Sequence, residues 1–343
     1  MPTIVEVANR AGVSPITVSR VVNSSGPVSS QVRARVEEAI AETGYVPNAV
    51  ARSLRSKRTD TIALVVTDMT NPFFTTIAHG VEAAVGDSGM MLIICGTDER
   101  EAKEERYVRM LLQRRVDGIL LVPAGDGAAA MRLCREQGTP FVVVDRRLPG
   151  GGSDAVRADS GAGAFELGRL LVSLGHRTMA VLTGPRAVLT ADDRAAGFRR
   201  AVVAAGGQLP SPRVYRGAFT IDSGREMAMR ALSAAPRPTA LFAANNFIAI
   251  GVLHALDEMR VRVPDDVAVV GFDDLPPAMV TVPFLTVAAQ PAYEMGQRSV
   301  AMLLARLSGG LGTGPPHEEV VLSTQLVVRR SSGDPLGVPH APA

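Results

Sequence analysis

Short apolar runs separated by longer helical segments dominate the chain from residue 61 onward. The first series begins near Thr61, Met90, Asp117 and Pro140, and a second series begins near Thr178, Thr239 and Asp266. Neighbouring runs are spaced by about one strand–helix–strand unit. Runs this continuously apolar are typical of parallel strands that are buried on both faces. The two series therefore predict two doubly wound α/β lobes.

The first 58 residues follow a different, helical pattern. Thr3 and Glu6 have the spacing of a capping box, which predicts the start of a short helix. The tripeptide Ala11-Gly12-Val13 indicates a tight turn. Ser14 is placed to cap a second helix, and Pro15 falls in its first turn, where a missing N–H costs nothing. Two short helices joined by a glycine-containing turn form a helix-turn-helix.

The second helix carries side chains that suit the major groove of DNA. Arg20 could donate two hydrogen bonds to guanine O6 and N7. Short polar side chains beside it would bind phosphate oxygens and fix the register. The candidate DNA-binding residues of this helix and its ends are Ser14, Ile16, Thr17, Ser19, Arg20 and Asn23. The alternative for this pattern alone is a small helical bundle with an ordinary solvated face.

The next segment favours the DNA-binding interpretation. A third helix is expected from about Ser29 to Thr43, followed by a short fourth helix that Asn48 caps. That fourth helix ends in a basic run in which Leu54 is the apolar exception. Leu54 either packs on the neighbouring domain or forms a wedge between base steps in the minor groove.

Charge and composition narrow the class of protein. Residues 1–60 carry 8 Lys and Arg against 5 Asp and Glu, whereas residues 61–343 carry 28 against 29. The positive end is thus the predicted DNA-binding end. We expect a cytoplasmic protein, because there is neither an export signal nor a run of 18 apolar residues. Cys95, Cys134 and the five scattered histidines give no metal-ligand spacing, so we expect no metal and no cofactor.

The stretches 5–23 and 45–54 resemble the headpiece of the LacI/GalR family of bacterial transcriptional repressors. The resemblance implies that Asn23, Ser29, Tyr45 and Asn48 touch the DNA backbone. It also implies that Ala51 and Leu54 of paired hinge helices lie in the minor groove. Pro15 and Ile16 depart from the family, because they occupy variable positions that read bases. Ile16 can touch a thymine methyl but cannot form a hydrogen bond.

Polar and aromatic side chains follow the predicted strands, where doubly wound sheets bind ligands. Taken singly, Asn71, Asn246 and Asp274 are expected to cap helices, the phenylalanines to be core residues, and Arg194 to be solvated. The resemblance extends over this region and implies a periplasmic-binding-protein-like core. Its effector contacts would map onto Phe73, Phe74, Asp145, Arg194, Phe219, Asn245 and Asp273. Asn246 is a departure, because many sugar-responsive relatives have Asp there.

We therefore predict a helix-turn-helix domain over residues 1–46, a hinge helix and linker over 47–59, and a two-lobed core over 60–330. The first lobe would take about 60–160 and 291–322, and the second about 161–290 and 323–330. A disordered tail would occupy 331–343.

The predicted function is a homodimeric repressor on bacterial nucleoid DNA that binds a pseudo-palindromic operator. Its affinity would be controlled by a small polar effector, a sugar or a nucleoside or purine, and both inducer and corepressor fit. A periplasmic binding protein would need an export signal and no helix-turn-helix. An α/β enzyme would need a Walker loop, a nucleophile elbow or a dinucleotide fingerprint, and the sequence contains none of these.

Overall fold

The computed structural model describes residues 2–23, 25–46, 58–86, 88–148, 152–186, 188–206, 210–276, 282–309 and 317–333. The chain divides into two compact units, Met1–Thr59 and Asp60–Ala343. We call them the headpiece and the core. Asn48, Ala51 and Leu54 lie outside the described residues, so the predicted hinge helix stays a prediction.

Three helices form the headpiece: α1 (Ile4–Ala11), α2 (Pro15–Val22) and α3 (Ser30–Thr43). The predicted capping box is present, because Thr3 N–H donates to Glu6 at 2.7 Å and Glu6 N–H donates to Thr3 Oγ1 at 3.3 Å. Gly12 and Gly44 end α1 and α3 in the left-handed conformation that glycine adopts without strain. Buried apolar side chains from all three helices meet at the centre, namely Val7, Ala8, Ala11, Val18, Val21, Val36 and Ala39.

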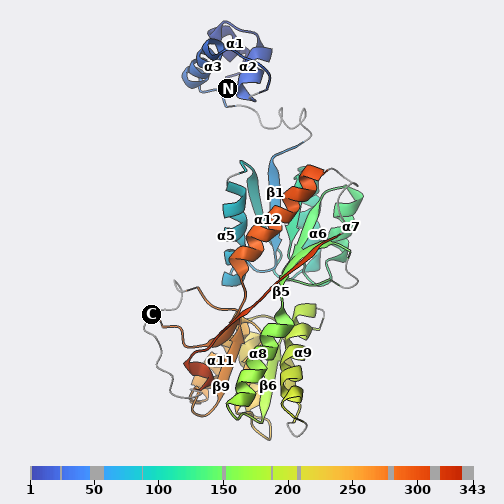
Figure 1. The fold of residues 1–343 in the computed structure, drawn as a ribbon, viewed down its shortest axis with the longest axis vertical. Coiled ribbons are helices and arrows are strands. Elements are labelled where there is room, and N and C mark those ends of the chain that lie inside the picture. The colour runs from blue at the N-terminus through green and yellow to red at the C-terminus, as the bar shows by residue number, and fades with distance from the viewer. Residues whose placement is uncertain are drawn as a thin grey trace. The chain divides into compact units, whose positions relative to one another are not determined.

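The first lobe of the core is a three-layered α/β/α unit. Its sheet has the order β11-β5-β4-β3-β1-β2 and is parallel throughout. Helices α5 (Pro72–Gly86) and α12 (Ala292–Gly309) cover one face, and α6 (Glu101–Gln113) and α7 (Ala128–Glu136) cover the other (Figure 1). The strands are β1 (Thr61–Val66), β2 (Met91–Gly96), β3 (Gly118–Leu121), β4 (Phe141–Val144), β5 (Asp154–Ala158) and β11 (Glu319–Leu322).

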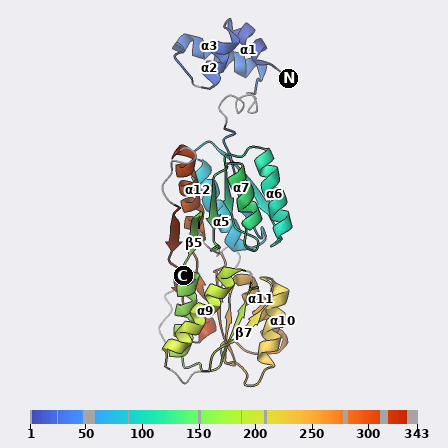
Figure 2. The same cartoon turned by 90° about the vertical axis from the view of Figure 1, so that its right-hand side faces the viewer.

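The second lobe repeats this plan. Its sheet order is β12-β10-β9-β8-β6-β7, and only β12 runs antiparallel to its neighbour. Helices α8 (Ser160–Ser173) and α9 (Leu189–Ala204) cover one face, and α10 (Ile221–Leu232) and α11 (Asn246–Glu258) cover the other (Figure 1, Figure 2). The strands are β6 (Met179–Thr183), β7 (Arg213–Arg216), β8 (Ala240–Ala243), β9 (Ala268–Phe272), β10 (Thr286–Ala289) and β12 (Gln325–Val327). The prediction of two doubly wound lobes is confirmed.

The predicted disordered tail begins too early. Residues 330–332 form a 3₁₀ turn in which Ser331 and Ser332 are buried. Ser331 Oγ donates to the Val269 carbonyl at 2.6 Å and accepts the Thr286 N–H at 2.8 Å. These bonds hold residues 331 and 332 against β9 and β10, a long-range arrangement that the polar composition of the tail could not reveal. The rest of the predicted tail, from 334, lies outside the described residues.

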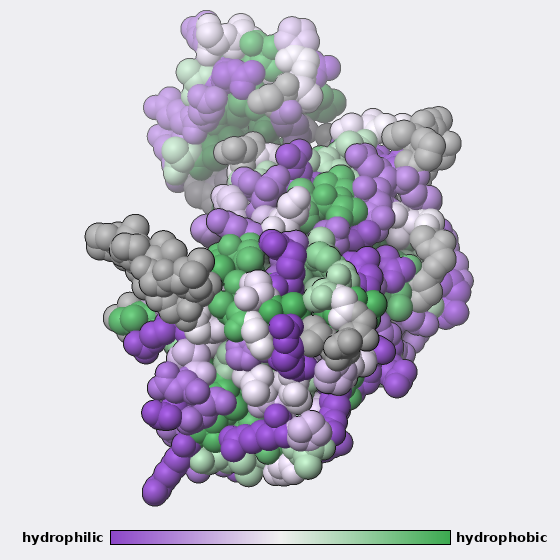
Figure 3. Space-filling model, turned by 60° about the horizontal axis from the view of Figure 1, so that its bottom comes forward, coloured by the Kyte–Doolittle hydropathy of each residue, from purple (hydrophilic) through white to green (hydrophobic). Residues whose placement is uncertain are grey.

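The surface seen in Figure 3 is mixed in polarity. On the face shown in Figure 3, hydrophilic side chains predominate and apolar ones gather in separate groups between them. Within the described part of the chain, no helix is long and apolar enough to cross a membrane.

Candidate functional site

The second headpiece helix has one buried and one exposed side. Val18 and Val21 are buried in the headpiece core, whereas Ile16 and Arg20 are exposed. Ser14 caps the helix, because its hydroxyl accepts the Thr17 N–H at 3.2 Å. The helix is therefore fixed by its apolar side and its cap, and its other side is exposed.

The other predicted DNA-binding residues of the headpiece are also involved in local structure. Ser29 caps α3 by accepting the Val32 N–H at 3.4 Å. Asn23 donates its amide to the Ser19 carbonyl at 2.7 Å, and the Tyr45 ring packs against the headpiece core. Contact between these side chains and DNA stays a prediction.

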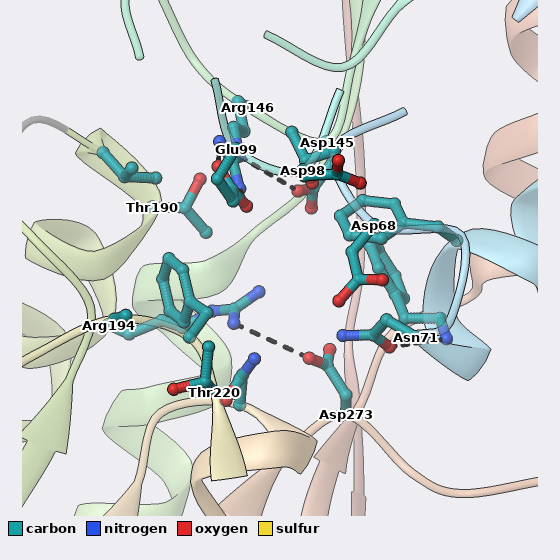
Figure 4. A pocket seen from close by; sticks show the side chains of 17 residues that line it. Asp68, Asn71, Asp98, Glu99, Asp145, Arg146, Thr190, Arg194, Thr220 and Asp273 are labelled. Atoms are coloured by element: carbon teal, nitrogen blue, oxygen red, sulfur yellow. Dashed lines mark hydrogen bonds and ion pairs between the residues drawn. The ribbon is translucent and has the colours of Figure 1, made fainter. Parts of the chain in front are cut away.

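A cavity of about 380 Å³ lies between the two lobes of the core. Its lining comes from the loops that follow the strands, and from the first two turns of the helices after them, in both lobes (Figure 4). The first lobe contributes Thr67, Asp68, Asn71, Phe73, Phe74, Asp98, Glu99, Asp145 and Arg146. The second contributes Val188, Thr190, Arg194, Ala218, Phe219, Thr220, Asn245 and Asp273. The carboxyl ends of the parallel strands of both sheets thus face one another across a space of ligand size.

Arg194 of α9 lines this cavity from the second lobe and is 3% exposed. Its Nη1 donates to the Ala244 carbonyl at 2.7 Å and lies 3.7 Å from Asp273 Oδ2 (Figure 4). Its guanidinium carbon is 3.9 Å from the centroid of the Phe272 ring, a cation–π contact. Arg194 is therefore not the solvated helix residue that α9 alone would suggest. Its guanidinium is in contact with three groups, so part of its donor capacity is already used.

A second arginine is buried on the opposite side of the cavity. Arg146 pairs through two nitrogens with the Glu99 carboxylate and donates to the Pro123 carbonyl at 2.7 Å. Its neighbour Asp145 is 7% exposed, and no hydrogen-bond partner for Asp145 Oδ1 exists among the described residues. Burial raises the pKa of Asp145 to about 6, although Arg194 and Arg146 act to lower it. Asp145 thus offers an acceptor that a ligand could use.

Three phenylalanines line the cavity in different ways. Phe73 and Phe74 meet edge to face, with ring centroids 5.1 Å apart. Each is only 6% exposed and belongs to the first-lobe core. Both are therefore mainly core residues, as expected for a phenylalanine taken singly. Phe219 is half-buried and lies over the end of β6, where a Cβ on Gly184 would be 2.2 Å from the ring. Glycine at 184 therefore allows Phe219 to cover the cavity.

The predicted helix caps on this side need correction. Asn245, not Asn246, caps α11 by accepting the Ile248 N–H at 2.8 Å. Asn246 instead exchanges two amide hydrogen bonds with Asn71 of the other lobe, at 2.9 and 3.1 Å. Asn71 also accepts the Phe73 N–H at 2.9 Å, as a cap would. Asn246 is therefore a link between the lobes and does not line the cavity.

Asp274 was also predicted to cap a helix. Residues 274–276, which are the described residues that follow it directly, are not helical. Its carboxylate pairs with the Arg329 guanidinium, with oxygen–nitrogen distances of 2.6 and 2.8 Å. The partner is 55 residues away in the sequence, so the local pattern could not reveal it.

Comparisons with known proteins agree with this architecture. Residues 3–48 match the family described as bacterial regulatory proteins, lacI family, and residues 169–332 match a periplasmic binding protein-like domain. The HTH-type transcriptional regulator DegA of Bacillus subtilis (strain 168) is 34% identical over 335 residues, which cover 96% of this chain and 98% of DegA. The chain belongs to the lacI family of bacterial regulatory proteins. It is a transcription regulator with a helix-turn-helix DNA-binding domain, and the resemblance inferred from the sequence is confirmed.

Other lacI-family proteins are similar over nearly their whole length. The ribose operon repressor of Escherichia coli (strain K12) is 36% identical over 309 residues, which cover 90% of this chain and 94% of that protein. A solved structure of the lac repressor dimer, bound to operator and the anti-inducer ONPF, aligns with a TM-score of 0.85 at 28% identity. That alignment covers 96% of this chain and 99% of the lac repressor chain.

The structure brings all seven residues that the family resemblance suggested as effector contacts to the lining of one cavity. Their role in binding stays a prediction. Sequence reasoning did not select Asp98, Glu99, Arg146, Thr190 and Thr220, although Asp98 and Glu99 lie in the loop that follows the predicted strand beginning at Met90. The position after a strand was a usable signal for these two. In the described residues, no group of three or more His, Cys, Asp or Glu side chains could hold a metal ion.

Proposed function

We propose that the chain is a dimeric repressor whose operator affinity is controlled by an uncharged, donor-rich effector bound between the lobes. The observation that carries the proposal is the cavity lined by polar side chains from both lobes in a lacI-family chain. A ligand that touches both lobes binds differently to each interlobe angle, and only such a difference can shift an equilibrium between two states. In a dimer, the interlobe angle would then control how the two headpieces are presented to DNA. A regulator of this kind acts on the chromosome in the bacterial cytoplasm.

The charge of the lining supports an uncharged effector. Acidic side chains (Asp68, Asp98, Glu99, Asp145 and Asp273) outnumber the two arginines in the lining. Both arginines are already engaged, Arg146 by Glu99 and Arg194 by Asp273. A phosphate or carboxylate ligand would be repelled by these carboxylates. Both arginines of the lining are already paired with a carboxylate, so neither is left to neutralise the charge of such a ligand. Hydroxyl and N–H donors of a sugar or a nucleoside would find acceptors.

A thermal-shift screen tests the effector class directly. Neutral sugars, nucleosides and purine bases form the main arms, and each sugar or nucleoside is paired with its phosphorylated form as a matched control. We expect stabilisation by a neutral compound and none by its phosphate. Stabilisation by the phosphate alone would contradict the proposed effector class and leave the regulatory role standing.

Operator binding is tested separately by mobility shift against duplexes from the region upstream of the coding sequence. Arg20→Ala should cost about 1–3 kcal/mol and relax the preference for a guanine in each half-site. Affinity should also fall steeply with salt, because Arg and Lys side chains release counterions from the phosphates. Equal weakening on all sequences would identify Arg20 as a phosphate contact.

A further inference from the structure

The first turn of α2 has an unusual surface for a helix that reads DNA. Ile16 is 67% exposed, and its neighbour Pro15 is also exposed. Neither side chain has a polar atom. The N-terminal residues of a recognition helix are the ones that meet base edges in the major groove. The base-reading end of α2 is therefore apolar, while Arg20 lies one turn further along.

The hydroxyl groups beside this apolar pair are occupied within the headpiece. Ser14 Oγ accepts the Thr17 N–H at 3.2 Å and lies 3.0 Å from Thr17 Oγ1, so the two hydroxyls share a hydrogen bond. Releasing Ser14 to a base would uncap the helix, which costs about 1 kcal/mol. Ile16 is thus an exposed side chain of the first turn that has no hydrogen bond within the headpiece to give up when it meets a base.

An isoleucine side chain discriminates between bases in one way only. Thymine carries a methyl group at C5 in the major groove, whereas the other base edges there present hydrogen-bond donors and acceptors. An apolar side chain gains by burying the methyl group. It loses where it covers a donor or acceptor that then has no partner.

We propose that Ile16 reads the C5 methyl group of a thymine in each operator half-site. This proposal rests on the DNA-binding role of the headpiece and adds the chemistry of one contact. The selectivity at that base pair comes from the methyl group and not from hydrogen bonds. Cytosine methylated at C5 should therefore partly substitute for thymine there, although the two bases pair differently.

The experiment uses the full chain and a duplex that the chain itself selects. Repeated selection from a library of randomised inverted repeats gives the preferred site. Each thymine of the half-site is then replaced by uracil, symmetrically in both half-sites, and binding is measured by mobility shift. Removing one methyl group per half-site from an apolar contact should weaken binding about threefold to fourfold per half-site, or about tenfold for the dimer. We expect this loss at one thymine position.

Variants of α2 assign the methyl contact to its side chain. For Ile16→Ala, the affinities for the thymine duplex and for the uracil duplex at that position should differ by less than twofold. Discrimination at the guanine read by Arg20 should be retained. Arg20→Ala is the matched control and should keep the uracil effect. In the parent, 5-methylcytosine at the same position should bind more tightly than cytosine.

Two results would overturn the proposal. One is a selected site in which no thymine-to-uracil replacement weakens binding. The other is a uracil effect that persists undiminished in Ile16→Ala, which would assign the methyl contact to another side chain, such as Thr17. Failure of the parent chain to select any duplex would refute the DNA-binding role itself, so the two kinds of failure are distinguishable.

Discussion

Asp145 and Asp273 occupy equivalent positions in the two lobes and face the same cavity. Each is the first residue after the strand that lies third in its sheet order, β4 or β9, and each has a φ of 68°. Asp145 N–H donates to the Val156 carbonyl at 2.9 Å, and Asp273 N–H donates to the Ala288 carbonyl at 3.0 Å. Their side chains differ in partners. Gln290 donates to Asp273 at 2.6 Å, whereas Asp145 Oδ1 has no hydrogen-bond partner among the described residues.

Asp145→Asn should weaken effector binding about tenfold or more and leave operator binding unchanged. Asparagine tolerates the positive φ of this position, so the backbone is retained and only the charge is lost. A hydrogen bond to a charged group contributes about 1.5–3 kcal/mol. Calorimetric titration with the effector found by the screen measures the loss. Asp222→Asn, on the exposed side of α10, is the control.

The same contact should depend on pH. Burial raises the pKa of Asp145 to about 6, so in the free protein the carboxylate becomes protonated as the pH falls through 6. A ligand that needs the ionised acceptor should then lose affinity by up to about tenfold per pH unit below that value. Asp145→Asn should remove this dependence between pH 5 and pH 7. A parent affinity that is flat over this range would show that the ligand does not use the ionised carboxylate.

Arg194→Ala should destabilise the core whether or not the effector touches Arg194. The substitution leaves Asp273 buried without its cationic neighbour, and removing one partner of a buried pair costs about 3–5 kcal/mol. Urea unfolding followed by circular dichroism measures the free energy of unfolding. Arg199→Ala, at an exposed position of the same helix, should stay within about 0.5 kcal/mol of the parent. Similar unfolding for both variants would mean that the buried network around Arg194 contributes little.

The paired amides of Asn71 and Asn246 should be energetically coupled. Their two hydrogen bonds join the lobes, and both side chains are buried. A double-mutant cycle with Asn71→Ala, Asn246→Ala and the double variant separates this pair from the helix-capping bond that Asn71 also makes. We expect a coupling of about 1 kcal/mol in the free energy of unfolding. Strict additivity would show that the bonds are replaced by water in solution.

Glu104 should make the core less stable as the pH rises from 4.5 toward 7. Its carboxyl is 2% exposed, and burial raises its pKa from 4.5 to about 7, against the bond from the Ala124 N–H and the charge of Arg146. Within this window the folded state keeps a proton that the unfolded state has released. Proton linkage therefore lowers the free energy of unfolding, by about 2–3 kcal/mol across the window.

Glu104→Gln removes this titration and keeps an oxygen that can accept the Ala124 N–H. As the pH rises from 5 to 7.5, the free energy of unfolding of Glu104→Gln should therefore increase relative to that of the parent. Glu136→Gln, at an exposed position, is the control and should show no such trend. Parallel pH profiles for Glu104→Gln and the parent would contradict the prediction.

Much of the local structure could be predicted from the sequence because its signals act over a few residues. The hydroxyls of Thr3, Ser14 and Ser29 each bond a backbone N–H three residues further along, so the residue types alone indicate where the helices begin. The apolar runs likewise predicted strands, because a strand buried on both faces excludes polar side chains along its length. The positions just after the strands then indicated which residues could meet a ligand.

The tertiary structure decided which partner each polar side chain has. Asn71 and Asn246 are 175 residues apart, and Arg329 lies 55 residues beyond Asp274. An Asn or Asp after a strand can cap a helix, join two lobes or bind an arginine. Which of these it does depends on the side chains that the fold places next to it. The sequence by itself therefore determined the helices, the strands and the family. The cavity, the ion pairs of its two arginines and the raised pKa of Asp145 exist only because the two sheets fold close together.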